Sequence, residues 1–322
     1  MAHVTPSDLT SLLGGITLQG VYKQLRQHEA APRSLSNRRR WVEPADVRRL
    51  LEGRDFTYPH LNIAFQIVKG GTGKTSLAYA LATRASHYGV RVLAIDFDQQ
   101  GNLTRSFNVD ARERPVWLHV VRDRLDPREC IIEVSETLHL LPSNLNNSRL
   151  DIEVTSRASN LRDMLRDKLE TIRSSYDLVV MDCPPAINKM NTAVTCGADL
   201  IIIPVNPDPY AIDGLDFTLA ELDRIKVEFK VRFDHQVVWN RYDARERLGM
   251  VYMHELAKSP TRAAHLLPVV IRTDTSVKNA IFQAKSVFDL PKRSAIQDDI
   301  DQFTREILGL NQWKEDKQAG VA

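Results

Sequence analysis

Short runs of apolar residues alternate along most of the chain with segments in which apolar residues recur every three or four positions. This periodicity predicts helices at residues 74–87, closed by Gly89, and around residues 161–172. The continuous runs predict strands at residues 61–68, 92–95, 138–143, 178–181, 200–203, 237–239 and 266–271. Strands that are apolar throughout and are separated by amphipathic helices indicate a parallel sheet with helices on both faces. We therefore expect an α/β fold built on a doubly wound, mostly parallel sheet.

The composition changes near residue 60, where Gly53 and Pro59 break a stretch that is typical of a linker. Before this point nine Lys and Arg stand against six Asp and Glu, so the local net charge is +3. We therefore divide the sequence into a small, helical N-terminal region, residues 1–58, and a large domain, residues 59–322. In the N-terminal region Pro44 begins a helix whose Arg48 and Arg49 we expect to point outward.

The bulk composition excludes several classes of protein. The formal net charge of the 322 residues is only +2, so any nucleic-acid surface must come from local clustering of Lys and Arg. Three scattered cysteines suit neither a disulfide framework nor a zinc cluster, and they predict free thiols in a reducing compartment. No apolar run reaches the roughly 18 residues that a membrane span needs. We expect a soluble, cytoplasmic protein with no membrane partner.

The segment "QIVKGGTGKTSL", residues 66–77, has the pattern of a phosphate-binding loop. Gly70, Gly71 and Gly73 allow a tight turn whose backbone amides point at phosphate oxygens, and the helix that follows adds the partial positive charge of its N-terminus. In such a loop Lys74 reaches the terminal phosphates and the Thr75 hydroxyl binds Mg²⁺. The pattern predicts a nucleotide site formed by Gly70, Gly71, Thr72, Gly73, Lys74, Thr75 and Ser76.

Acidic residues end two other predicted strands. Asp182 follows the run "YDLVVM" and is placed to hold the shell of the metal ion, while Asp96 and Asp98 follow residues 92–95. Two carboxylates beside a triphosphate are unfavourable unless a cation or the proton of a water uses them. One of Asp96 and Asp98 is therefore a candidate for orienting the water that attacks the nucleotide.

These motifs resemble the ParA/MinD-type ATPases, which are P-loop NTPases with a deviant Walker A motif. The family pattern K-G-G-x-G-K-[ST] is met by residues 69–75, and "DFDQQGNLT", "VVMDCPP" and "CGADLIIIPVNPDPYAIDGL" are similar to its later motifs. The resemblance covers roughly residues 61–310 and is strongest to the ParA proteins of DNA partition, especially those with an N-terminal DNA-binding extension. Gln99 stands where the family usually has proline, which leaves the hydrolysis rate open.

The resemblance implies a role for each of these residues. Lys69, the lysine at the start of the loop, would cross a dimer interface and contact the phosphates bound by the facing subunit. Asp98 would orient the water, Asp182 and Thr75 would support the metal ion, and Asp96 would order the loop or a metal-bound water. Asn240 and Arg241 fall where the family recognises adenine, with a turn-capping asparagine as the alternative.

The resemblance also implies the cofactors and partners: ATP, Mg²⁺, a second copy of the chain, DNA, and a ParB-like protein that stimulates hydrolysis. Such an ATP-bound dimer binds DNA without sequence preference and would be associated with the nucleoid. Non-specific binding needs only Lys and Arg near phosphates, although each candidate alone is more often a solvated charge. The candidates are Arg38, Arg39, Arg40, Arg48, Arg245, Arg272, Lys278 and Lys285.

Three other functions compete with DNA partition. A MinD-like ATPase that positions a non-DNA cargo at a membrane would need a basic amphipathic helix at the C-terminus, but the segment that begins "QDDID" opens acidic and favours docking on the protein's own core. An electron carrier like nitrogenase reductase would need paired cluster cysteines. A transcriptional regulator could use ATP to switch its N-terminal region. Residues 37–53 resemble the wing and helix of MerR-type winged helices, which leaves an autorepressor and a simple dimerisation arm both open.

Overall fold

A mostly parallel sheet lies at the centre of the computed structural model, which describes residues 4–30, 32–34, 40–157, 160–208, 210–282, 285–290 and 293–319. Within these residues the sheet has eight strands in the order β10-β9-β8-β3-β7-β4-β6-β5, and β5 alone runs antiparallel to its neighbour. The strands are β3 (Leu61–Phe65), β4 (Val92–Asp96), β5 (Ile132–Ser135), β6 (Leu138–Leu141), β7 (Leu178–Asp182), β8 (Leu200–Val205), β9 (Asp234–Tyr242) and β10 (Leu266–Arg272). The predicted α/β fold is confirmed.

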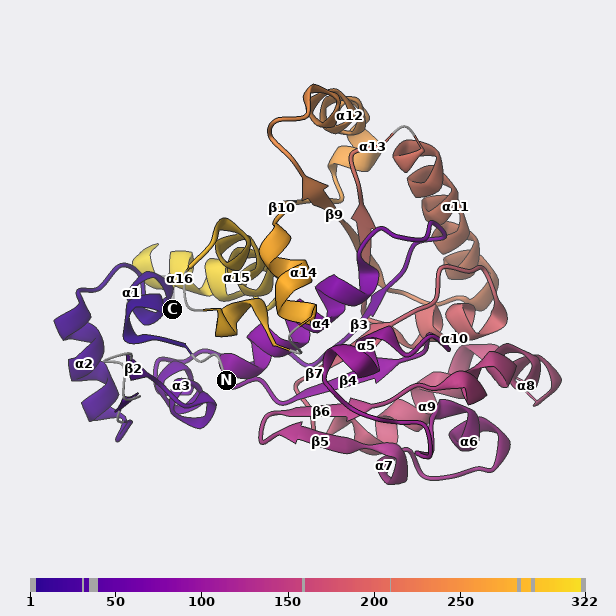
Figure 1. The fold of residues 1–322 in the computed structure, drawn as a ribbon, viewed down its shortest axis with the longest axis horizontal. Helices are drawn as coiled ribbons and strands as arrows, with labels where there is room; N and C mark the ends of the chain where they lie inside the picture. The colour runs from indigo at the N-terminus through magenta and orange to yellow at the C-terminus, as the bar shows by residue number, and fades with distance from the viewer. Residues whose placement is uncertain are drawn as a thin grey trace.

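Helices cover both faces of this sheet (Figure 1). One face packs on α4 (Lys74–His87), α5 (Asn102–Ser106), α14 (Thr275–Phe282), α15 (Ala295–Ile307) and α16 (Leu310–Ala319). The other packs on α6 (Trp117–Arg122), α8 (Leu150–Arg157), α9 (Leu161–Arg173), α10 (Lys189–Gly197), α11 (Ala211–Phe229) and α12 (Arg247–Lys258). The short pieces α7 (Pro127–Cys130), α13 (Pro260–Ala263), η1 (Leu145–Arg149) and η2 (Val287–Asp289) lie in connections.

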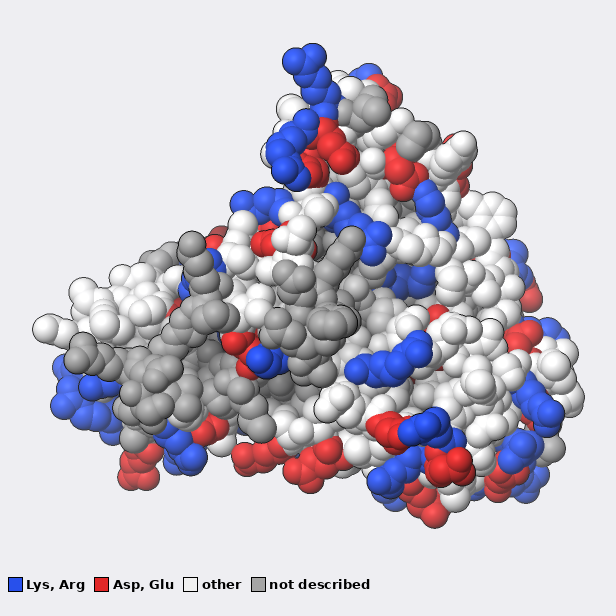
Figure 2. All heavy atoms as spheres, in the orientation of Figure 1, with Lys and Arg blue, Asp and Glu red and all other residues white. Residues whose placement is uncertain are grey.

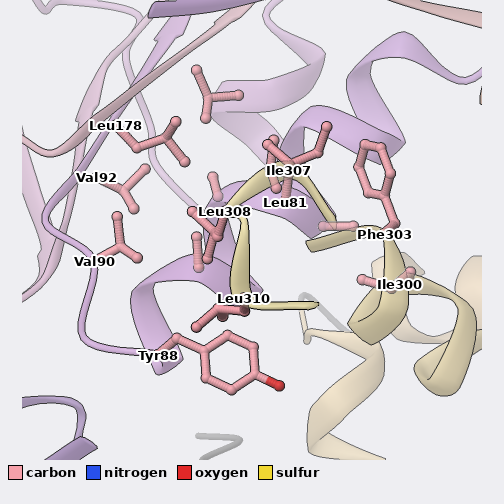
Figure 3. Close-up of a cluster of buried hydrophobic side chains, with 14 of the residues drawn as sticks. Leu81, Tyr88, Val90, Val92, Leu178, Ile300, Phe303, Ile307, Leu308 and Leu310 are labelled. Carbon is pink, nitrogen blue, oxygen red and sulfur yellow. The ribbon is translucent and has the colours of Figure 1, made fainter. Parts of the chain in front are cut away.

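Alternate side chains along the central strands pack into two separate hydrophobic cores, one on each face of the sheet. Val92 and Ala94 of β4 join the cluster on the α4 side, whereas Leu93 and Ile95 join the cluster on the α9 side. Because successive side chains of a strand point to opposite faces, a strand buried on both faces must be apolar at every position. Figure 3 shows the first cluster, in which Leu81 of α4 lies among residues of α15 and of the sheet.

Most predicted elements agree with the structure, and the differences lie mainly at their ends. The predicted helix at residues 74–87 is confirmed, and Gly89, with a φ of 80°, follows its C-cap while the Val90 amide donates to Ala85 O at 3.2 Å. The strand predicted at residues 61–68 ends at Phe65, because the rest of the apolar run enters the glycine loop. The short antiparallel strand β5 has no continuous apolar run and was not predicted.

The C-terminal segment docks on the body of the protein, as its acidic start predicted. Ile300, Phe303 and Ile307 of α15 are at most 7% exposed and pack in the same cluster as α4. No helix among the described residues is long and apolar enough to cross a bilayer.

The N-terminal region folds against the body of the protein. It contains α1 (Pro6–Leu12), α2 (Leu18–Gln27), a small hairpin of β1 (Arg33–Ser34) and β2 (Arg40–Trp41), and α3 (Pro44–Glu52). Val47, Leu50 and Leu51 of α3 are fully buried and belong to the cluster that contains α4 and α15. This region therefore shares a core with the large domain. Its classification as a winged helix stays a prediction.

The prediction that Arg48 points outward is wrong. Its Nη1 atom donates to Asp177 Oδ2 at 2.6 Å and to Gly89 O at 3.0 Å, and its guanidinium lies 4.2 Å from the centre of the Tyr58 ring. Asp177 is 1% exposed, so this arginine, together with Arg91, neutralises a buried carboxylate of the large domain. Sequence periodicity could not show this, because the carboxylate lies 129 positions away along the chain.

A buried cluster of charges also joins the N-terminal region to the body. Arg84 of α4 is 2% exposed and its Nε atom donates to Asp301 Oδ1 of α15 at 2.6 Å, while Asp8 of α1 lies 3.8 Å from Arg84 Nη2. Tyr88 donates its hydroxyl to the same Asp301 oxygen at 2.6 Å. Asp301 also pairs with Arg305 at 2.7 Å and Asp8 with Arg293 at 2.7 Å, so a largely buried network of ion pairs links α1, α4 and α15.

Gly89 offers a test of how α3 docks. A Cβ atom there would lie 2.5 Å from Pro44 O and 2.7 Å from Arg48 Cβ, whereas at Gly309, which has a similar φ of 70°, it would meet nothing within 4 Å. Gly309→Ala should therefore cost about 1 kcal/mol, the strain of the left-handed backbone alone. Gly89→Ala should cost at least about 2 kcal/mol more, because α3 must move away. Urea unfolding measures both, and equal losses would contradict this account of the docking.

Candidate nucleotide-binding site

The loops that follow β3, β4, β7 and β9 meet at the carboxyl edge of the sheet, where they enclose a hollow of about 890 Å³. In open α/β sheets ligands bind at this edge. Most of the predicted residues come together here, together with several that were not predicted. The lining consists of Gly71, Gly73, Lys74, Thr75, Ser76, Asp98, Gln99, Gln100, Asn102, Arg105, Ser106, Pro184, Pro185, Ala186 and Arg241.

The glycine loop turns directly into α4. Gly73 is the N-cap of this helix and has a φ of 94°, which side chains other than glycine rarely adopt. A Cβ atom at Gly73 would lie 2.3 Å from Asn240 Nδ2, and the same Nδ2 atom donates to Thr72 O at 2.7 Å. Asn240, at the end of β9, therefore holds the loop in place. Its reading of adenine stays a prediction, and the Nδ2 amine of its side-chain amide already donates to the loop.

Lys74 lies inside the loop. It is 6% exposed, and its ammonium donates to Ile67 O at 3.4 Å and to Lys69 O at 3.3 Å. Burial lowers the pKa of this ammonium, and the nearby Asp182 carboxylate opposes the shift. A buried cation at the positive end of a 14-residue helix forms a strong site for an anion.

Asp96 and Asp182 lie opposite each other at the ends of the paired strands β4 and β7, and both are fully buried. Burial raises the pKa of Asp96 to about 6. Burial raises the pKa of Asp182 well above its usual range, and repulsion from Asp96 is the second cause of this shift. The hydrogen bond from the Thr75 hydroxyl and the charge of Lys74 act against it. Two ionised carboxylates side by side at this depth need a cation nearby.

The oxygens around Asp182 fit a divalent metal ion. Thr75 donates its hydroxyl to Asp182 Oδ2 at 2.7 Å, while Asp182 Oδ1 is buried and has no hydrogen-bond partner among the described residues. A carboxylate and a hydroxyl at the mouth of a phosphate-binding loop are the oxygen ligands that Mg²⁺ uses together with phosphates and water. The predicted pair of Thr75 and Asp182 thus lies together.

Asp96 holds the loop that carries Asp98. Asp96 Oδ2 accepts from the Thr104 amide at 2.9 Å and from its hydroxyl at 2.8 Å, and Asp96 Oδ1 accepts from the Asp98 amide at 3.1 Å. Asp98 Oδ1 in turn accepts from the Gln100 amide at 2.9 Å, and the Asp98 side chain lines the hollow. Of the two predicted uses of Asp96, ordering the loop agrees with these contacts. A contact to a metal-bound water stays a prediction.

Lys69 lies in different surroundings from Lys74. Its ammonium forms an ion pair with Asp208, in the connection between β8 and α11, and lies 5.7 Å from the centre of the Tyr210 ring. The side chain is 29% exposed. One lysine of the loop is therefore buried among the loop carbonyls, and the other lies at its rim.

Arg241 lines the main hollow and also a second one of about 360 Å³ beside α4. Its backbone is left-handed, with a φ of 56°. The second hollow is largely apolar and also contains Asn240, Ile271, Thr273 and Val277. Sequence analysis missed the residues after β10. The rule that found the glycine loop, a strand followed by a polar turn and a helix, also applies to residues 273–275.

The predicted DNA contacts are scattered over the molecule. Arg272 pairs with Asp299 through its Nε and Nη2 atoms, and Arg48 pairs with Asp177, so both have a structural role. Arg245 is 88% exposed beside Asp243, just before α12, and Arg40 and Lys285 are exposed. Figure 2 shows Lys and Arg gathered around α12 at the top of the view, with acidic residues among them. Arg38, Arg39 and the side chain of Lys278 lie outside the described residues.

Comparison with known proteins gives one family and several relatives. Residues 61–235 match the AAA domain family. The chain is 33% identical over 188 residues to the chromosome-partitioning ATPase Soj of Thermus thermophilus, covering 58% of this chain and 72% of Soj.

Solved structures share the fold at lower identity. A putative plasmid partition protein from Borrelia burgdorferi bound to AMPPNP is 22% identical, with a TM-score of 0.64 and coverage of 80% and 99% of the two chains. Cobyrinic acid a,c-diamide synthase from Mycobacterium smegmatis, with an ATP analog and magnesium, is 20% identical, with a TM-score of 0.67 and coverage of 79% and 95%.

The raised pKa of Asp182 predicts how stability depends on pH. In the folded protein without nucleotide and metal, Asp182 holds its proton to a higher pH than in the unfolded chain, so the cost of ionising it grows as pH rises through that window. Asp182→Asn removes this cost. By urea unfolding in EDTA, the variant should be more stable than the parent near pH 8, and this gain in stability should shrink toward pH 5.

The exposed Asp167 of α9 supplies the matched control, because Asp167→Asn removes one carboxylate from the surface. It should change stability little at either pH. An Asp182→Asn variant that loses stability at the higher pH would show that the carboxylate is not a source of strain.

Proposed function

The chain belongs to the AAA domain family and, within it, to the ParA-type partition ATPases, and from this premise we propose that it is an ATP-dependent DNA partition protein. ATP would close two subunits into a dimer that binds DNA without sequence preference. Hydrolysis, stimulated by a ParB-like partner, would release it. The observation that carries this proposal is the contrast between the two lysines of one loop, Lys74 inside it and Lys69 at its rim.

ATP and Mg²⁺ fit the site described above. The amides of residues 70–75 and the Lys74 ammonium would bind the phosphates, and the main hollow has the size of a nucleotide site. Thr75 and Asp182 would hold Mg²⁺, which neutralises charge on the phosphates when bound. The largely apolar second hollow, which shares Ser76 and Arg241 with the main one, is the candidate site for the base. The Borrelia protein with AMPPNP and the Mycobacterium enzyme with magnesium support this assignment by their fold.

Asp98 is the proposed group that orients the attacking water. It lines the hollow at the edge of the phosphate loop, and Asp96 fixes the backbone that carries it. Gln99 and Gln100 line the hollow beside Asp98. A partner that contacts this connection would change the position of Asp98, which is a physical route for stimulation of hydrolysis.

Lys69 would serve the facing subunit. Its own loop is already occupied by Lys74, and the exposed part of Lys69 lies at the rim. An ammonium that meets a desolvated polyphosphate contributes strongly, and the γ-phosphate of ATP supplies charge that ADP lacks. Dimerisation would therefore depend on ATP.

DNA would bind the dimer through exposed Lys and Arg, of which Arg245, 88% exposed, is one described candidate. Binding of this kind falls steeply with salt, with a slope of about −0.9 for each phosphate neutralised. The cellular place that follows is the nucleoid in the cytoplasm. The alternatives are an ATPase that positions a cargo other than DNA, and a regulator that ATP switches.

Alanine substitutions of the two lysines should impair different steps, ATP binding for Lys74 and dimerisation for Lys69. Lys74→Ala should weaken ATP binding by roughly a hundredfold, because it removes a buried cation from the phosphates. Lys69→Ala should keep the affinity within about threefold but lose the ATP-dependent dimer and its turnover. Calorimetry gives the affinity and light scattering gives the mass. A Lys69→Ala protein that dimerises and hydrolyses like the parent would rule out the role in the facing subunit.

Asp98→Ala should bind ATP and Mg²⁺ normally yet hydrolyse ATP at least about a hundredfold more slowly, since a group that orients water acts mainly in the transition state. The variant should accumulate as the dimer. Asp110→Ala is the control, because Asp110 is exposed and pairs with Arg112 beyond the loop. Normal turnover in Asp98→Ala would move the role to another residue.

A second function, repression of the chain's own operon, is favoured by the N-terminal region. Two helices, a hairpin and a third helix follow one another there, and α2 presents exposed Gln19, Lys23 and Arg26 beside the buried Val21 and Leu25. A helix with one buried face and one exposed polar face suits the major groove. A dimerisation arm is the alternative.

The proposed DNA recognition by the N-terminal region is best tested without deleting this region, because α3 shares its core with the large domain. Gln19→Ala combined with Lys23→Ala should abolish a discrete footprint on the DNA upstream of the gene, in ADP as in ATP. ATP-dependent binding to random DNA should persist. The absence of a footprint even with the parent protein would leave only the dimerisation arm.

A further inference from the structure

The connection between β8 and α11 contacts the phosphate loop at two points. Asn206 Nδ2 donates to Gly71 O at 3.2 Å, and Asp208 pairs with the ammonium of Lys69. β8 is the direct neighbour of β3 in the sheet, so the segments that follow these strands leave the same edge side by side. The proposed function uses Lys69 but assigns nothing to this connection.

The Asp208 carboxylate has a second contact, within its own segment, besides the one to Lys69. Its Oδ1 atom also accepts the Tyr210 amide at 3.0 Å, which fixes it near the first turn of α11. The Tyr210 ring lies 5.7 Å from the Lys69 ammonium, and Lys69 Cβ lies 3.8 Å from the position of a Cβ on Gly214. The Lys69 side chain therefore lies against the start of α11 and the residues just before it in its own subunit, and both ionised groups are about 30% exposed.

One ammonium cannot pair fully with Asp208 and with a phosphate of another subunit at the same time. We infer that Asp208 is a positioning residue that holds Lys69 within its own subunit and so opposes dimerisation until a phosphate of the facing nucleotide replaces it. The inference rests on the proposed function of Lys69. Breaking the Lys69–Asp208 pair adds a free-energy cost to dimerisation. A nucleotide without the charge of the γ-phosphate does not offset this cost, so the pair sharpens the distinction between ATP and ADP.

The size of the effect follows from the exposure of the pair. Partly exposed ion pairs change an equilibrium by about 1.4-fold to fivefold. A symmetric dimer breaks two such pairs, so loss of the Asp208 charge should lower the dissociation constant of the ATP-bound dimer by between about twofold and thirtyfold.

Asp208→Asn removes the charge but keeps an oxygen that can accept the Tyr210 amide. Asp208→Ser is a second variant with the same property. Asp213→Asn is the matched control, because Asp213 is exposed in the first turn of the same helix. The first measurement is the rate at which an N-hydroxysuccinimide acetate ester acetylates Lys69 in the protein without nucleotide, followed by peptide mass spectrometry. The second is the dimer dissociation constant with ATP and Mg²⁺, by sedimentation.

Both Asp208 variants should acetylate Lys69 severalfold faster than the parent and dimerise more tightly, while Asp213→Asn should match the parent. Lys69→Ala combined with Asp208→Asn should gain nothing over Lys69→Ala. Unchanged acetylation overturns the inference, and so does a weaker dimer, which would mean that Asp208 presents Lys69 to the partner. A parent that forms no dimer with ATP would refute the proposed function instead, and it would leave the acetylation rates to decide whether Asp208 shields Lys69.

Discussion

The carboxylates of Asp96 and Asp182 lie side by side at the ends of two central strands, where water does not reach them. This arrangement is unfavourable unless positive charge lies close by, and Lys74, the first turn of α4 and a metal ion beside Thr75 can supply it. The rest of the site follows from this constraint. Asp96 uses its oxygens to fix the loop of Asp98, whereas Asp182 keeps one oxygen without a partner among the described residues.

Helix α4 connects the phosphate loop, beside these two buried carboxylates, to the rest of the molecule. It begins at the phosphate loop and ends about 21 Å away, where Arg84 and Tyr88 enter the buried cluster with Asp301. Asp8 of the N-terminal region belongs to the same cluster. One helix therefore links the candidate nucleotide site to the N-terminal region.

The sequence predicted what depends on local pattern. Consecutive apolar residues, the glycines of the loop and the acids at strand ends each express their structure over a few positions, so the sheet and most of the site were found. Pairings between distant residues were not. Arg48 and Arg272 appeared as surface charges, yet each neutralises an acid brought to it by folding. Asp208 lay within a quoted motif, but its contact with Lys69 spans 139 positions and has no local signal. The shared fold of a partition protein and a cobyrinic acid a,c-diamide synthase shows why function must be argued from such contacts.

The central claim is that ATP switches the affinity of this chain for DNA. The most direct measurement is binding of the unmodified protein to a random-sequence duplex with ATP and Mg²⁺, with ADP and Mg²⁺, and without nucleotide, each over a series of salt concentrations. The account predicts tight binding with ATP alone, at an affinity that does not depend on the sequence and falls steeply with salt. Equal binding in the three nucleotide states would contradict it.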